Sequence, residues 1–108
     1  MSATKTASEL IFETVTHWDG VTVEPGPRGA MSIRYNEKRE LAHLHGDRSA
    51  HFAFPREVSR RLKEEGQVID HPLGEKYQGL AARQLDTDED IEQVIGLIRM
   101  NYDREAAR

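Results

Sequence analysis

The sequence contains no cysteine, so it can form no disulfide, thiolate nucleophile or Cys-ligated metal centre. It also lacks long hydrophobic runs. No stretch approaches the roughly 20 apolar residues that span a bilayer, and the first residues lack the apolar core of a signal peptide. We therefore expect a cytoplasmic protein without a membrane partner.

An excess of positive charge is missing too, because 19 acidic residues outnumber 15 basic ones and the formal net charge is −4. General nucleic-acid binders usually carry a basic surface, so no nucleic-acid partner is expected. The basic residues within 56–63 alternate with glutamates and fit a solvated helix face. With 37% hydrophobic and 31% charged residues in 108 positions, the chain fits one globular domain over 1–108. Its first few residues are expected to be flexible.

Three helices are predicted from their boundary signals. Thr6 and Glu9 have the spacing of a capping box, followed by apolar residues at helical spacing. A second helix is predicted within 55–66, because proline suits a first turn and glycine follows a last one. The final helix begins after Asp86 or Thr87, with acidic residues in its first turn.

Alternating apolar and polar residues predict the strands of the chain. The segments are 21–23, 31–35, 40–45, 49–54 and 79–86. A further segment, 67–72, fits either a short strand or an extended loop. The fold class predicted is α+β, with an antiparallel β-sheet of about four to five strands and helices packed on one face, a two-layer sandwich.

The register of the hairpin formed by 31–35 and 40–45 follows from its turn. A four-residue turn at 36–39 would set Tyr35 opposite Glu40. It would also set Ile33 opposite Ala42, on the apolar face. The other face would then carry Ser32, Arg34, Leu41, His43 and His45.

A third histidine is expected on the same face. If Phe52 and Phe54 join the apolar face, the alternation of the strand sends His51 to the polar one. A three-residue loop at 46–48 would set His51 opposite His43. The histidines are therefore predicted to gather because the phenylalanines occupy the core side.

From Glu40 onward the chain carries, in order, the blocks ELAHLHGD, FAFPREVSRRLKEEG and GLAARQLDTDEDIEQVIGLIRMNYDR. This order resembles that of the small bacterial luciferase-domain proteins. The same domain is assigned to the luciferases of bioluminescent fungi, which oxidise a small aromatic luciferin with dioxygen. In the resemblance, His43 and His45 form the HxH pair and His71 is the later histidine. His51 stands where the family commonly has an acidic residue.

The function predicted is the binding of a small aromatic or anionic molecule on the histidine face. His43 and His45 are the candidate catalytic residues, since imidazole transfers protons near neutral pH. Arg34 is the candidate anion anchor. Further candidate substrate-binding residues are His51, His71 and Tyr77. Any chemistry is expected to be acid–base chemistry or cofactor-independent oxidation.

A metal centre is the weaker interpretation of these histidines. His43, His45 and His51 could offer three nitrogens to zinc or iron. HxH on a strand is common without a metal, however, and the sequence fixes no carboxylate nearby to orient the rings. We therefore expect no metal and no other cofactor.

The alternative class of function is a non-catalytic protein-interaction module or a homodimerising domain. A small-molecule site predicts a concave pocket that contains at least two of His43, His45, Arg34 and His71. An interaction module predicts a flat surface that exposes apolar residues such as Leu41. The position of Leu41 therefore helps to separate the two.

Overall fold

The computed structural model describes residues 4–74 and 76–108, so the expected flexibility of the first few residues falls largely outside the described part. The elements are α1 (Ala7–Val15), β1 (Val21–Pro25), a 3-10 turn (Pro27–Gly29), β2 (Met31–Tyr35), β3 (Arg39–His45), β4 (Ser49–Ala53), α2 (Arg56–Glu64), β5 (Ile69–Asp70), β6 (Leu80–Gln84) and α3 (Asp88–Ala106). No helix in the described segments has the length and apolar content that a membrane crossing needs.

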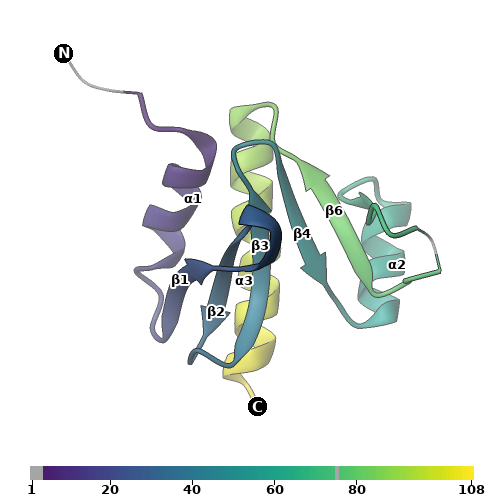
Figure 1. Cartoon of the computed structure of the whole chain (residues 1–108). Helices are drawn as coiled ribbons and strands as arrows, with labels where there is room; N and C mark the ends of the chain where they lie inside the picture. The colour runs from purple at the N-terminus through teal and green to yellow at the C-terminus, as the bar shows by residue number, and fades with distance from the viewer. Residues whose placement is uncertain (1–3, 75) are drawn as a thin grey trace.

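The sheet has six strands in the order β1-β2-β3-β4-β6-β5, and every neighbouring pair is antiparallel (Figure 1). The α+β class and the antiparallel sheet are confirmed, but the predicted four to five strands are too few. The additional strand is β5, which pairs with β6 through only two residues. So short a segment cannot show the alternation by which a strand is recognised.

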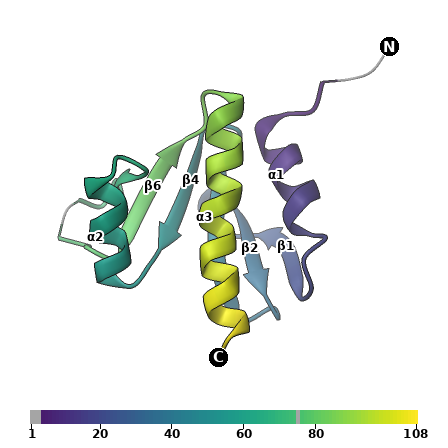
Figure 2. The same ribbon diagram turned by 180° about the vertical axis from the view of Figure 1, so that it is seen from behind.

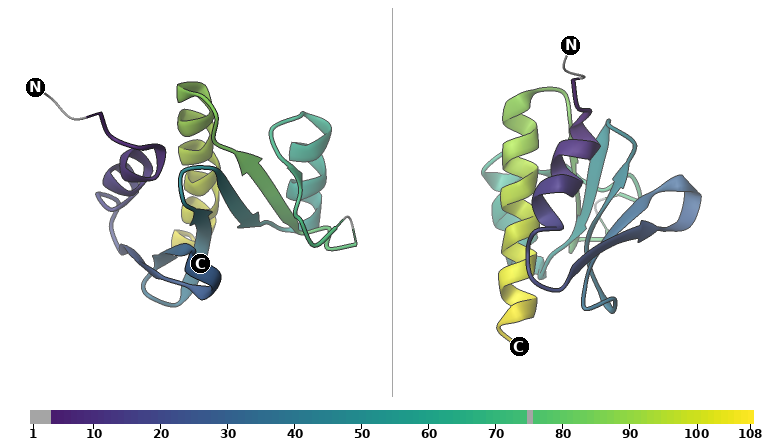
Figure 3. Two further views of the ribbon diagram at one scale, coloured as in Figure 1. Left: turned by 45° about the horizontal axis from the view of Figure 1, so that its top comes forward. Right: turned by 90° about the vertical axis from the view of Figure 1, so that its left-hand side faces the viewer.

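The core lies between the sheet and α3, which crosses the sheet between α1 and α2 (Figure 2). Val94, Leu97 and Ile98 of α3 are buried against the strands, and Ile11 and Val15 of α1 pack into the same core. Figure 3 shows α1 and α3 running side by side. α1 begins with the predicted capping box of Thr6 and Glu9. For α3 the prediction left the cap open between Asp86 and Thr87; the cap is Thr87, which forms a capping box with Asp90.

The hairpin of β2 and β3 contains a β-bulge that the sequence does not reveal. Ile33 pairs with Ala42 as predicted, but Tyr35 pairs with Arg39 and not with Glu40. The turn is therefore one residue shorter than predicted, and Leu41 is the extra residue in β3.

The bulge corrects the predicted position of Leu41. Its side chain is 1% exposed and belongs to the hydrophobic core, not to the polar face. The buried amide of Asn101, on α3, donates hydrogen bonds to the carbonyl oxygens of Leu41 (2.9 Å) and Ala53 (3.2 Å). Because the bulge reverses the alternation, Glu40 moves to the face that carries His43.

Candidate functional site

Four histidines form one group, here called the histidine cluster: His43, His45, His51 and His71. His43 on β3 pairs with His51 on β4, as predicted. The ring centre of His51 lies 5.0 Å from that of His43 and 4.4 Å from those of His45 and His71. Strand pairing therefore places three of the rings, and the loop after β5 brings the fourth.

The histidine cluster lines a cleft of about 630 Å³. The cleft collects the candidate site residues Arg34, His43, His45, His51 and His71. Its other walls come from the loop at 26–30, from Lys38 and Glu40, and from residues near the ends of β4 and β6. Tyr77 is not among the lining residues; it is 42% exposed, and the Lys76 ammonium lies 5.3 Å from its ring centre.

A carboxylate orients one of the histidines. Glu40 Oε1 lies 3.0 Å from Nδ1 of His43, and Glu40 Oε2 accepts a hydrogen bond of 2.6 Å from Ser32 Oγ. Burial alone would raise the pKa of Glu40, but the hydrogen bonds from His43 and Ser32 outweigh it and lower that pKa. An ionised carboxylate only accepts, so Nδ1 of His43 donates to it, and in the neutral ring Nε2 then carries no proton. The expectation that no carboxylate is fixed near the histidines was wrong.

Burial keeps the other imidazoles neutral. It is the largest cause that lowers the pKa of His51 to about 4, and the neighbouring His71, His45 and His43 lower it further. Burial is likewise the main reason that the pKa of His45 and the pKa of His71 are lowered. The imidazoles of His45, His51 and His71 are therefore polar but uncharged at neutral pH.

Three cations, Arg28, Arg34 and Lys38, line the cleft and are here called the cationic rim. Glu40 is the one carboxylate among the described lining residues, so positive charge is in excess. Nε of Arg34 is buried and has no hydrogen-bond partner within the described residues. Glu24 Oε1 lies 3.3 Å from it but without the alignment of a hydrogen bond.

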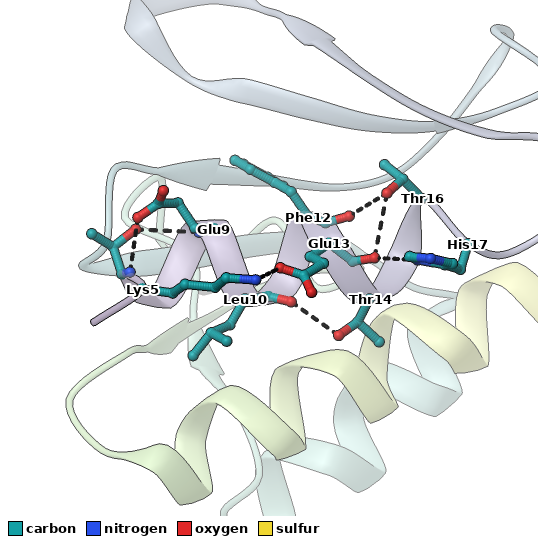
Figure 4. Close-up of polar contacts among 9 residues, drawn as sticks. Lys5, Glu9, Leu10, Phe12, Glu13, Thr14, Thr16 and His17 are labelled. Carbon is teal, nitrogen blue, oxygen red and sulfur yellow. Dashed lines mark hydrogen bonds and ion pairs between the residues drawn. The ribbon is translucent and has the colours of Figure 1, made fainter. Parts of the chain in front are cut away.

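The fifth histidine, His17, lies elsewhere. It follows α1, and its Nδ1 contacts the carbonyl oxygen of Glu13 at 2.6 Å (Figure 4). Thr16 also bonds to backbone carbonyls of the last helical turn. His17 therefore completes the end of a helix and is a suitable control for the histidine cluster.

Sequence reasoning missed Arg28, Lys38 and Glu40. Arg28 and Lys38 lie in turns, where strand alternation predicts nothing about side-chain direction. The backbone at Arg28 has the left-handed φ of 59°. Glu40 was assigned to the wrong face because the bulge at Leu41 has no signature in the sequence.

The fold and the cleft define a small antiparallel α+β domain with a polar cleft on one face of its sheet. The profile of the luciferase domain matches residues 38–101, more than half of the chain, and the chain belongs to the luciferase-domain family. The histidine cluster and Glu40 lie inside the matched segment, whereas Arg28 and Arg34 precede it. No curated protein and no solved structure matches the chain.

Proposed function

We propose that the cleft binds a small aromatic anion and that the imidazoles beside it transfer protons. The observation that carries the proposal is that one cleft contains all four residues, His43, His45, Arg34 and His71, of which a small-molecule site requires at least two. Leu41 is buried in the core, so this residue does not provide the exposed apolar surface that the interaction-module alternative predicts.

The charges of the cleft favour an anion. Arg34 lines the cleft, and its Nε makes an ion pair with Glu24 at 3.3 Å but no hydrogen bond among the described residues. A carboxylate or phenolate on a ligand would add charged hydrogen bonds to the guanidinium. The chain as a whole carries a negative net charge, but the cationic rim concentrates positive charge at the cleft. This local positive charge attracts anions.

The two candidate catalytic histidines differ in their contacts. His43 is held by Glu40 through Nδ1, whereas the ring of His45 makes no hydrogen bond within the described residues. His45 is therefore the proton acceptor in this proposal, and His43 is a fixed polar group of the cleft floor. The apolar carbons of Pro72, Leu73 and Leu80 offer a surface for an aromatic ring.

The test uses para-hydroxybenzoate and its neutral analogue para-hydroxybenzamide in thermal unfolding and calorimetric titrations. Ligand at tenfold excess over Kd adds about 1.4 kcal/mol, which raises the Tm of a domain of this size by about 5 °C. We expect this shift with the carboxylate and a weaker one with the amide. Arg34→Ala should weaken carboxylate binding by about 10–100-fold, since charged hydrogen bonds contribute about 1.5–3 kcal/mol.

Arg60→Ala is the matched control, because Arg60 is an exposed arginine of α2 whose ion pairs are with Glu57 and Glu64. It should bind the carboxylate as the unmodified protein does. Binding that survives both in Arg34→Ala and in a His43→Ala/His45→Ala double variant would place the ligand outside the cleft and overturn the proposal.

A further inference from the structure

We propose that His43, His51 and His71 bind one divalent transition metal of the zinc type, with an open coordination position that faces the cleft. This inference goes beyond the proposed function, which needs only an anion site and a base. It also departs from the expectation of no metal, because the ligand set now includes His71 in place of His45 and an orienting carboxylate is present.

The geometry of the three rings carries the inference. One ligand nitrogen from each of the three residues can be chosen so that all lie within 4.8 Å of one another. Tetrahedral zinc with Zn–N distances of about 2.0–2.1 Å needs nitrogens about 3.4 Å apart. The rings therefore have to close by roughly 1.4 Å at most, which side-chain rotation and a small loop movement supply.

Glu40 supplies the second observation. It accepts from Nδ1 of His43, which leaves Nε2 of that ring unprotonated and free to ligate. Metal-bound histidines commonly donate their other ring N–H to a carboxylate, which fixes the ring and raises its basicity. Ser32 holds the second oxygen of Glu40, so the carboxylate is itself oriented.

His71 needs one rearrangement to join the set. In the metal-free protein its Nδ1 accepts a hydrogen bond of 3.1 Å from the backbone N–H of Leu73, so a neutral ring carries its proton on Nε2. Ligation through Nε2 moves that proton to Nδ1, and the Leu73 N–H then loses its acceptor. Metal binding should therefore shift the loop at 72–74, while the protein gains or loses no proton at His71.

His45 stays outside the ligand set. Its ring centre is 4.4 Å from that of His51, but it does not belong to the group whose nitrogens converge. A metal on the other three rings therefore leaves the His45 ring without a metal ligand role. This arrangement keeps the base of the proposed function available.

The inference is tested on chelator-treated protein without a polyhistidine tag, by calorimetric titration with Zn²⁺. We expect one site per chain. His43→Ala, His51→Ala and His71→Ala should each lower the affinity at least about 100-fold, and Glu40→Gln about 10–100-fold. His51→Gln keeps a polar side chain in the cleft floor, but it should lose as much affinity for Zn²⁺ as His51→Ala does. The controls His45→Ala and His17→Ala should stay within a few-fold of the unmodified protein.

The backbone amide of Leu73, followed by NMR, gives a readout that an adventitious surface ion would not move. Its resonance should shift when Zn²⁺ is added to the unmodified protein. Addition of Zn²⁺ to His71→Ala should not shift the Leu73 resonance of that variant. Absence of Zn²⁺ binding overturns the inference. So does a loss in His17→Ala as large as that in His43→Ala.

The outcome is separable from that of the proposed function. Arg34→Ala should bind Zn²⁺ normally, because Arg34 is not a ligand, while its binding of para-hydroxybenzoate falls. Zinc binding without benzoate binding would support the metal site and overturn the anion site. Benzoate binding without zinc binding would support the anion site and overturn the metal site.

Discussion

The two faces of the sheet are organised by different rules. On the face under α3, regular alternation places Ile33, Ala42 and Leu44, which are each at most 1% exposed, and Leu41 joins them through the bulge. On the cleft face, strand residues meet side chains from three loops, and a bulge decides which carboxylate is present. The core face therefore follows from a pattern in the sequence, whereas the cleft face depends on local departures from that pattern.

One residue connects the two faces. Asn101 lies in α3, but its amide holds the carbonyl oxygen of Leu41 at the bulge. The bulge in turn sets the direction of Glu40, which orients His43. A polar group buried in the core thus positions the carboxylate of the cleft.

The largest expected effect comes from breaking this connection with Asn101→Leu. The substitution removes the Asn101 donor from the buried hydrogen bond to the Leu41 carbonyl and from the part-buried one to the Ala53 carbonyl, which should lower the free energy of unfolding by about 2–4 kcal/mol. Glu40 should also lose its fixed direction. We therefore expect the Nδ1 resonance of His43 to shift in NMR spectra.

Ile98→Ala is the control for this experiment. It removes a fully buried side chain of the same helix and should cost a similar free energy of unfolding, about 2–4 kcal/mol. It should leave the His43 resonance in place. If Asn101→Leu also leaves that resonance unchanged, the two faces are independent and the connection is wrong.

The contrast between the faces also explains how much of the strand pairing and of the cleft can be predicted from the sequence. The pairing of Ile33 with Ala42 follows from the alternation of side chains along a strand, and the pairing of His43 with His51 also needs the length of the loop at 46–48. The side of Glu40 could not be predicted, because no local pattern marks the bulge and the carbonyl of Leu41 there bonds to Asn101, 60 residues later in the sequence. Arg28 reaches the cleft from a loop, where no periodicity applies.

On the helix side of the sheet, an ion pair between Arg83 and Asp90 lies at the start of α3. Asp90, near the start of α3, accepts hydrogen bonds from Arg83 at 2.6 Å and from the backbone N–H groups of Asp86 and Thr87. Arg83 is the main cause that lowers the pKa of Asp90 to about 2. Because the carboxylate is partly exposed to solvent, we expect Asp90→Asn to cost only about 1–2 kcal/mol of stability at neutral pH.

The dependence of this cost on pH has a definite sign. A carboxyl whose folded pKa is depressed stabilises the protein above its unfolded pKa, near 4, and loses that contribution as the pH falls toward 2. Denaturant unfolding of both proteins should therefore show a difference that is constant above about pH 5 and nearly absent at about pH 2. Zinc and benzoate binding at neutral pH should be unaffected. A difference that persists unchanged at about pH 2 would show that the charge of Asp90 is not its cause.

The smallest effect on stability is expected on the cleft side, at Arg28. This residue has a left-handed φ of 59°, which glycine adopts without the steric cost that other residues meet. Arg28→Gly should therefore raise the free energy of unfolding, by about 0.5–1 kcal/mol. It should also weaken the binding of para-hydroxybenzoate several-fold, because the cationic rim loses one charge.

Arg28→Lys separates the two effects, because it keeps both the charge and the backbone strain. Its stability and its benzoate affinity should match those of the unmodified protein. A stabilised Arg28→Gly protein with unchanged benzoate affinity would remove Arg28 from the ligand site. Opposite changes in stability and affinity would instead show that the loop at 26–30 holds a strained conformation that serves the cleft and not the fold.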